Sequence, residues 1–173
     1  PGVAGTRGVQ NIVRADPEGY NLVFTVNGPI TLVPLINRNV RYTFEDLEPI
    51  GIVAHTPLIL VVPENSPWRT FQDLVSAGRR GGAAVYNFGS PGVGAVTHVA
   101  AEMVNMRTGT TFVHIPYRGT PEILVALAAG DVHWYLITGI DGKGPIADGR
   151  LRALANMSHE RSSNFPTVPT MEE

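Results

Sequence analysis

The fold of this chain is decided by residues 86–98, which read YNFGSPGVGAVTH. The pattern is typical of the end of a buried strand, a glycine-rich turn and the first turn of a helix. Such a junction leaves backbone N–H groups unpaired at the helix start, where the helix dipole adds partial positive charge, so the natural guest is an anion. Gly89, Gly92 and Gly94 permit positive φ angles and a close approach of a ligand to the backbone. We therefore expect an anion-binding loop at residues 90–97, which we call the anion loop.

Strands and helices alternate on both sides of the anion loop. The expected strands are residues 20–26, 50–54, 58–62, 83–88, 111–116, 132–137 and 151–157. The expected helical segments before the anion loop are residues 9–15, a short helix or irregular cover at 30–36, and a helix that Ser66 caps with Pro67 at its first position. After the loop, we expect one helix from Val96 to Thr108-Gly109 and a second that Thr120 caps and Gly130 ends. A helical turn is expected at residues 145–148. The alternation over residues 58–157 predicts an α/β architecture with a mostly parallel sheet flanked by helices. The tail from Arg161 is rich in proline and is expected to be loose.

The candidate site follows from this architecture. In such sheets ligands bind at the carboxyl ends of the strands, where loops meet helix starts. The anion loop, residues 117–120 and Thr138-Gly139 are expected to meet there, with Asn27 facing them from a second lobe. Asn27 and Thr138 each end a strand, so each is either a cap or a ligand contact, and Arg118 either steers the anion or is a plain surface charge. The predicted contacts are Asn27, Ser90, Gly92, Gly94, Thr97, Tyr117, Arg118, Gly119 and Thr138.

Composition excludes several classes of protein. Hydrophobic residues make up 43% of the 173 residues and charged residues 16%, which is typical of a globular chain. The formal net charge is -2 and the basic residues are scattered, so no nucleic-acid footprint is expected. The absence of cysteine excludes disulfides, thiolate nucleophiles and cysteine metal sites. No apolar run approaches the ~18 residues of a membrane span, and no signal-peptide pattern is present. Because the sequence begins at Pro1, we expect a mature, trimmed or partial chain.

The anion loop admits other interpretations. Ser90 with His98 or His114 and an acid such as Glu102 can be written as a hydrolase triad, but Phe88 stands where the G-x-S-x-G elbow needs its first glycine. A bare strand–helix connection would use the glycines for a tight turn alone. The five histidines show no metal-ligand spacing, so neither a metal nor a cofactor is expected. His98 is expected to be a structural histidine that bonds a nearby loop.

The same segment carries a family resemblance. Together with His98, residues 86–94 resemble the Y-x-F-G-S-x-G-x-G-x-x-x-H block of Bug-type solute receptors, the extracytoplasmic binding proteins of tripartite tricarboxylate transporters. Further blocks resemble that family in order and spacing at residues 16–20 (DPEGY), 46–51 (DLEPIG), 114–120 (HIPYRGT), 149–155 (GRLRALA) and 166–170 (PTVPT). As a set, these blocks cover nearly the whole chain.

The resemblance implies a two-lobed periplasmic binding protein-like fold of type II, with mostly parallel sheets flanked by helices. It implies a non-enzymatic periplasmic monomer that closes on a small carboxylated anion and presents it to membrane transporter subunits. A di- or tricarboxylate, an aromatic acid or an amino acid would suit such a site. The family loop that grips the carboxylate from the second lobe corresponds to Tyr117-Arg118-Gly119. An effector-binding sensory domain on the same scaffold is the alternative.

The resemblance also implies a partial chain. The family's first strand and its ligand loop are missing, and the family continues beyond Glu173. We therefore expect residues 1–54 to be the remnant of an incomplete first lobe, residues 55–157 the second lobe, and residues 158–173 a segment that returns toward the first lobe. Ala95, His133 and Ile137-Thr138 depart from the family pattern, and these departures bear on which ligand the site would take.

Overall fold

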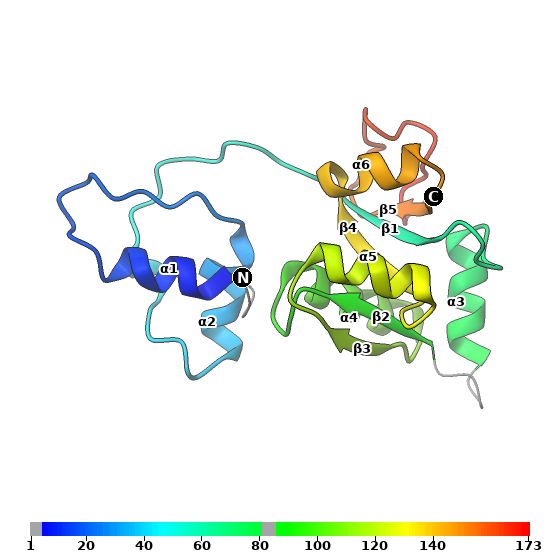
Figure 1. Ribbon diagram of the computed structural model, residues 1–173, viewed down its shortest axis with the longest axis horizontal. Coiled ribbons are helices and arrows are strands. Elements are labelled where there is room, and N and C mark those ends of the chain that lie inside the picture. The colour runs from blue at the N-terminus through cyan, green and yellow to red at the C-terminus, as the bar shows by residue number, and fades with distance from the viewer. Residues whose placement is uncertain (1–4, 81–85) are drawn as a thin grey trace.

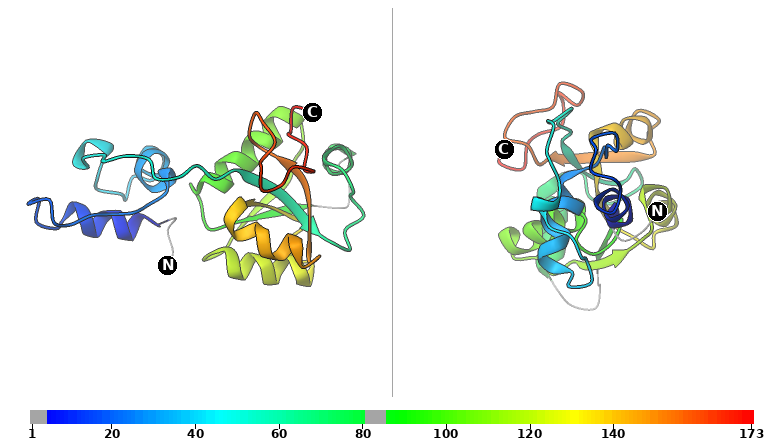
Figure 2. Two further views of the ribbon diagram at one scale, coloured as in Figure 1. Left: turned by 90° about the horizontal axis from the view of Figure 1, so that it is seen from above. Right: turned by 90° about the vertical axis from the view of Figure 1, so that its left-hand side faces the viewer.

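The computed structural model describes residues 5–80 and 86–173. Figure 1 shows two parts: a five-stranded sheet with helices on both faces, and a part made of short helices and extended segments. We call residues 58–80 and 86–173 the sheet part, and residues 5–57 the N-terminal part. Seen from above in Figure 2, the N-terminal part lies at one end of the sheet part and covers neither of its faces.

The sheet has the strand order β3-β2-β4-β1-β5. The strands are β1 (Leu58–Pro63), β2 (Asn87–Ser90), β3 (Val113–Pro116), β4 (Trp134–Thr138) and β5 (Leu151–Asn156). β2 pairs in parallel with β3 and β4, whereas β1 pairs antiparallel with both β4 and β5. The prediction of a mostly parallel sheet is confirmed, since β1 alone among these five strands runs against the others. The first three residues of the predicted strand 83–88 lie outside the described residues.

Both faces of the sheet are apolar, as a sheet covered by helices on both sides requires. The covering helices are α3 (Phe71–Arg80), α4 (Val96–Thr108), α5 (Thr120–Ala129) and α6 (Gly139–Ala147). Along β1, Leu60 and Val62 join the cluster that packs under α3 and α4, while Ile59 and Val61 join the cluster under α5 and α6. All four side chains are fully buried, so β1 reads in the sequence as a continuous apolar run.

The helix α3 begins later than predicted. The Thr70 hydroxyl accepts from the Asp73 N–H at 3.1 Å, and Asp73 Oδ2 accepts from the Thr70 N–H at 2.9 Å, which makes a capping box. The Ser66 hydroxyl instead accepts from the Trp68 N–H at 3.3 Å, in the turn before the helix. The predicted cap at Ser66 is wrong because the Thr70–Asp73 pair satisfies two backbone N–H groups reciprocally, whereas Ser66 offers a single hydroxyl.

The helix α6 is longer than the turn predicted at residues 145–148. It starts at Gly139, since the Thr138 hydroxyl accepts from the Asp141 N–H at 3.2 Å and caps the helix. The glycines of this segment carry no side chain, so the helical spacing of apolar residues that would reveal α6 in the sequence is missing.

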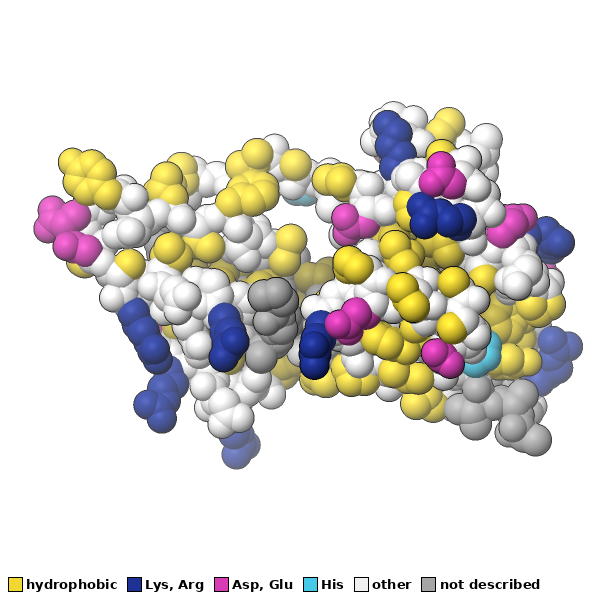
Figure 3. Space-filling model, in the orientation of Figure 1, with side chains coloured by type: hydrophobic (Ala, Val, Ile, Leu, Met, Phe, Trp, Pro, Cys, Tyr) yellow, Lys and Arg dark blue, Asp and Glu magenta, His cyan; other side chains and the backbone are white. Residues whose placement is uncertain are grey.

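The N-terminal part keeps its predicted helices and loses its predicted strands. Its helical segments are α1 (Thr6–Val13), the π-helical η2 (Gly28–Leu32), α2 (Val33–Ile36) and the 3₁₀ segment η3 (Phe44–Asp46). The predicted strands 20–26 and 50–54 are wrong: both segments are extended but belong to no sheet, and Tyr20, Phe24 and Ile50 are 91%, 85% and 82% exposed. Figure 3 shows hydrophobic side chains standing on the surface of this part. No described strand lies beside either segment to supply hydrogen bonds and a packed face.

The tail is held against the sheet, so the prediction of a loose tail is wrong. The Asn156 N–H donates to the Pro169 carbonyl at 2.8 Å, and the Met171 N–H donates to the Asn156 carbonyl at 2.9 Å. Phe165 and Val168 are buried in the cluster under α5 and α6. These two side chains anchor a segment that forms no long helix or strand of its own.

Candidate anion-binding site

The anion loop joins the carboxyl end of β2 to the start of α4, as predicted. Gly92 and Gly94 have φ angles of 130° and 84°, a region that favours glycine. Gly89 is different, because it lies within β2 and a Cβ there would come within 2.8 Å of Ile123 Cγ2 on α5. Gly89 therefore allows close helix–sheet packing and, unlike Gly92 and Gly94, does not use the positive φ that a glycine permits.

The N-terminal part packs directly on the anion loop. A Cβ at Gly94 would lie 2.6 Å from Ile36 Cδ1 of α2, and a Cβ at Gly28 would lie 3.1 Å from Val96 Cγ2. Both glycines are buried. The start of α4 therefore faces the N-terminal part across a contact that has no room for further side chains.

The start of α4 presents donors without acceptors. The first bond of the helix joins the Val99 N–H to the Ala95 carbonyl at 3.1 Å, and Ala95 provides no side-chain cap. Within residues 5–80 and 86–173, no acceptor takes the N–H groups of Val96, Thr97 or His98. The Thr97 hydroxyl is buried as well, and it has no hydrogen-bond partner in the described part of the chain. Three N–H groups and one buried hydroxyl thus lack an acceptor among the described residues, and unpaired donors at a helix start favour an anion.

Ser90 gives the anion loop its shape and does not present its hydroxyl to solvent. The side chain is fully buried. Its Oγ accepts from the Gly92 N–H at 3.2 Å, donates to the Gly92 carbonyl at 3.0 Å and lies 2.6 Å from His114 Nε2. These contacts use the hydroxyl fully, so a contribution of Ser90 to anion binding comes through the geometry of the loop.

A pair of histidines with tilted rings lies under the loop. The rings of His98 and His114 are 4.0 Å apart between centroids, and both stack on Phe88. The Gly94 N–H donates to His98 Nδ1 at 3.2 Å, which confirms the prediction that His98 bonds a nearby loop. Burial lowers the pKa of His98, against the opposing charge of Glu102. Burial and then the neighbouring His98 lower the pKa of His114 to about 4.

This arrangement resembles a hydrolase triad only in composition. Ser90 is within hydrogen-bonding distance of His114, but the acid Glu102 lies 3.8 Å from Nε2 of the other histidine, His98. A nucleophile needs access to a substrate carbonyl, and the Ser90 hydroxyl is enclosed. The site therefore offers donors to an anion and no accessible nucleophile.

The loop at residues 117–119 meets the anion loop through its backbone. The Tyr117 N–H donates to the Ser90 carbonyl at 2.8 Å. The Tyr117 ring packs against the cluster under α5, and burial, with a smaller effect of Asp131, raises the pKa of its phenol. Gly119, and not the predicted Thr120, is the N-cap of α5. Arg118 is exposed, and its guanidinium forms no ion pair with the described residues.

Thr138 and Asn27 differ in whether their side chains form hydrogen bonds within the protein. The Thr138 hydroxyl accepts from the Asp141 N–H and donates to Asp141 Oδ2 at 3.0 Å, so it acts as a helix cap. The Asn27 side chain is exposed, and the backbone carbonyl of Asn27 accepts from the Thr31 hydroxyl at 2.9 Å. Of the predicted side-chain contacts, Arg118 and Asn27 thus remain exposed, and the Thr97 hydroxyl is buried without a partner among the described residues.

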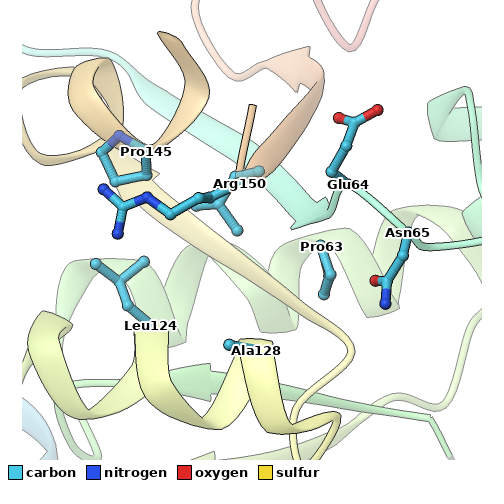
Figure 4. A pocket seen from close by; sticks show the side chains of 8 residues that line it. Pro63, Glu64, Asn65, Leu124, Ala128, Pro145 and Arg150 are labelled. Atoms are coloured by element: carbon cyan, nitrogen blue, oxygen red, sulfur yellow. The ribbon is translucent and has the colours of Figure 1, made fainter. Parts of the chain in front are cut away.

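A separate hollow of about 310 Å³ lies at the opposite end of the sheet. Figure 4 shows Leu124 and Ala128 of α5, Pro145 of α6, Pro63 at the end of β1 and Arg150 before β5 around it. Its lining is mainly apolar, and no motif in the sequence indicated it.

Two classes of site are not found in the part of the chain that the structure describes. No three His, Asp or Glu side chains there come together as a metal site. In the same residues, no helix combines the length and the apolar composition that crossing a membrane requires.

Comparison with known proteins shows which family this chain belongs to. Residues 1–173 match the family described as "Tripartite tricarboxylate transporter family receptor". The chain is 33% identical over 175 residues to a UPF0065 protein of Bordetella bronchiseptica, a match that covers 100% of this chain and 51% of that protein. The chain spans about half the length of the curated relatives it matches.

Two solved structures are similar over nearly the whole chain. The periplasmic binding protein BugD superposes with a TM-score of 0.89 at 26% identity, and the match covers 99% of this chain and 57% of BugD. The R. palustris protein Rpa4515 with adipate superposes with a TM-score of 0.88 at 25% identity, and the match covers 96% of this chain and 56% of that chain. The expected periplasmic binding protein-like fold is confirmed.

Proposed function

Because the chain belongs to the tripartite tricarboxylate transporter receptor family, we propose that it is the ligand-binding part of a receptor that captures a small carboxylated molecule and presents it to membrane transporter subunits. The observation that supports this most is the start of α4, where three N–H groups and the buried Thr97 hydroxyl lack acceptors among the described residues. The proposal includes no chemical step and places the protein in the periplasm, the compartment named for BugD.

The energetics favour a carboxylate at this position. A buried polar group without a partner costs about 1–3 kcal/mol, and Thr97 Oγ1 has no partner in the part of the chain that the structure describes. A carboxylate oxygen accepts from hydroxyls and from N–H groups, and charge-assisted bonds of this kind are about twice as strong as neutral ones. The helix dipole of α4 adds attraction without any basic side chain, which suits a site that must also release its ligand.

The remaining predicted residues take secondary roles in the proposal. Arg118 steers the anion toward the loop, since its charge is exposed and unpaired among the described residues. The Gly119 backbone and the Asn27 amide line the sides of the site, and Tyr117 joins its loop to the anion loop. Thr138 is assigned to capping α6. The lobes are assigned as residues 1–54, residues 55–157 and a return segment at residues 158–173.

The adipate-bound relative suggests a dicarboxylate as the first ligand to test. In a thermal-shift screen with adipate, malate, citrate, benzoate and glutamate, ligand at 100 times its Kd stabilises the native state by about 2.7 kcal/mol. For a chain of this length that corresponds to a rise in Tm of roughly 5–10 °C. The absence of a shift with every one of these acids would contradict the proposal.

Thr97→Val is the matched variant for this screen. It removes the hydroxyl and keeps the shape of the side chain, so the Tm of the free protein is expected to stay equal or to rise, while the ligand-induced shift falls. Thr111→Val serves as the control, because Thr111 is exposed at the far end of the sheet part and its substitution leaves the shift unchanged. An equal ligand-induced shift in Thr97→Val and in the unaltered chain would place the anion elsewhere.

A further inference from the structure

We propose that His98 and His114 position the anion loop as a neutral pair, so that uptake of a proton by the pair loosens the loop and weakens anion binding. This inference rests on the proposed function for its consequence, but its structural half concerns the ligand-free loop alone. It assigns to the two histidines a role in positioning the donors of the site without touching the ligand.

The pair holds both ends of the loop. His114, from β3, lies 2.6 Å from the Ser90 hydroxyl at the end of β2. His98, from the first turn of α4, accepts the Gly94 N–H at 3.2 Å. The rings lie 4.0 Å apart and stack on Phe88, so a shift of one ring disturbs the other. The segment from Ser90 to Gly94 is therefore fixed at each end by one member of the pair.

The bond to Gly94 defines the protonation state of His98. Nδ1 accepts an N–H, so it carries no proton, and the single ring proton of neutral His98 is on Nε2. Protonation places a hydrogen on Nδ1, which then faces the Gly94 N–H and can no longer accept. His98 is the only acceptor of the Gly94 N–H among the described residues, so this donor loses its partner.

The surroundings of the pair keep it neutral near pH 7. Burial lowers the pKa of both histidines, and the charge of a protonated His98 opposes protonation of His114. The charged or titratable groups that act on the pair are Glu102 on α4 and the histidines themselves; Phe88 of β2 contributes only its ring face. Because burial lowers the pKa of His98 below that of a free imidazole, its protonation belongs to acidic conditions, and burial together with the charge on His98 then holds the pKa of His114 at about 4.

Two effects of protonation oppose each other, and geometry decides between them. A positive charge on His98 attracts an anion at the start of α4, whereas loss of the Gly94 bond disorders the loop that aims the donors. Glu102 Oε1 lies 3.8 Å from His98 Nε2, so the Glu102 carboxylate offsets much of the positive charge that His98 gains. The hydrogen bond to Gly94 has no such compensation. Weaker binding at low pH is therefore the expected net result.

The first test uses the ligand-free 173-residue chain and amide hydrogen exchange measured by NMR. At pH 7 the Gly94 amide should be protected in the unaltered chain and in His98→Asn, whose Oδ1 takes the place of Nδ1 as acceptor. In His98→Leu the protection should fall about tenfold, the equivalent of one hydrogen bond. At pH 4.5 protection of Gly94, relative to the capping amide of Gly109, should fall in the unaltered chain and persist in His98→Asn.

The second test measures the Kd of adipate at pH 7.5 and pH 4.5. Comparing the unaltered chain with His98→Asn at the same pH cancels the protonation of adipate itself. The two should agree at pH 7.5, and the unaltered chain should bind about tenfold more weakly at pH 4.5. His133→Asn is the matched control, since His133 is another half-buried histidine with a lowered pKa, bonded to Asn87 at the opposite end of β2. It should keep the pH dependence of the unaltered chain.

The outcomes separate this inference from the proposed function. Equal protection of Gly94 in His98→Leu and in the unaltered chain would overturn the positioning role. Binding at pH 4.5 that is as tight as, or tighter than, that of His98→Asn would overturn the link to pH. If adipate binds neither the unaltered chain nor any variant, the proposal that adipate is a ligand is wrong. The hydrogen exchange of the Gly94 amide still decides whether the histidine pair positions the loop.

Discussion

Residues 50–54 and residues 58–62 are both apolar runs rich in β-branched side chains, yet only the second is a strand. Ile59 of β1 is fully buried, whereas Ile52 is 78% exposed. β1 has β4 on one side and β5 on the other, and helices cover both of its faces. Residues 50–54 have no neighbouring strand among the described residues. The pair shows that β propensity yields a strand only where neighbours supply hydrogen bonds and a packed surface.

The order that the N-terminal part does have comes from a few specific contacts. Val9 and Val33 are buried, and the Tyr42 hydroxyl donates to the Pro29 carbonyl at 2.6 Å. The packing of α2 on Gly94 adds a link to the sheet part. These contacts fix the helical segments and leave the extended segments exposed, which Figure 3 shows as hydrophobic side chains on the surface. Helices form with local hydrogen bonds, and strands do not.

The largest expected effect tests this contrast with one chemical change at two places. Ile59→Ala removes a fully buried side chain from β1, and such changes cost about 2–5 kcal/mol of the free energy of unfolding. Ile52→Ala removes the same group from an exposed position, where the change should stay within about 0.5 kcal/mol. Urea unfolding followed by circular dichroism measures both. A loss of several kcal/mol in Ile52→Ala would mean that residues 50–54 are packed in solution.

The contrast also explains how far the sequence could predict this fold. Continuous apolar runs at β1 and β4, and the glycine-rich junction before α4, indicated the sheet part correctly because each element there meets its neighbours within the chain. The runs at 20–26 and 50–54 have the same local character, and nothing local shows that no described strand lies beside them. The prediction for α6 failed for the opposite reason: the local sequence, rich in glycine, gives no helical pattern, although the Thr138 cap and packing stabilise a helix there.

The junction that carries the candidate site was predictable from the sequence, whereas the roles of its side chains were less so. The junction before α4 indicated an anion site, and the structure brings Ser90, Gly92 and Gly94 together there with Thr97. The spacing of residues in the sequence did not reveal that the Ser90 hydroxyl is bonded inside the protein, because its partner His114 is 24 positions away. Likewise, the pairing of His98 with His114 depends on β3 lying beside β2.

An intermediate effect concerns the contact that joins the two parts. Gly94→Ala places a Cβ 2.6 Å from Ile36 Cδ1 at a φ of 84°, whereas Gly109→Ala meets open space at a φ of 65°. The left-handed conformation costs about 1–2 kcal/mol in both variants, and overpacking adds about 1–3 kcal/mol in Gly94→Ala alone. Combining Gly94→Ala with Ile36→Ala should recover the added part. Equal losses of stability at Gly94 and Gly109, measured by urea unfolding, would mean that α2 does not press on the loop.

The smallest effect concerns the tail, which is irregular like residues 20–26 and yet is held in place. Arg161 Nε donates to Glu173 Oε1 at 3.0 Å, and bonding to Arg161 is the largest of the effects that lower the pKa of Glu173 to about 2. A carboxyl group with a lowered pKa stabilises the fold at every pH above its unfolded pKa, and this contribution is lost as the pH falls through the pKa of the folded state. The unaltered chain should therefore lose stability between about pH 4.5 and pH 2, as measured by the urea midpoint.

Glu173→Gln should start from a slightly lower midpoint at pH 6 and decline less over that window. Both side chains of the pair are nearly half exposed, so the difference is expected to be small, well below that of Ile59→Ala. Phe165 and Val168, which are buried, should hold the tail even when the ion pair is broken. Loss of amide protection at Met171 in Glu173→Gln would show that the tail has been released. In that case the ion pair, and not the two buried side chains, would be what holds the tail against the sheet.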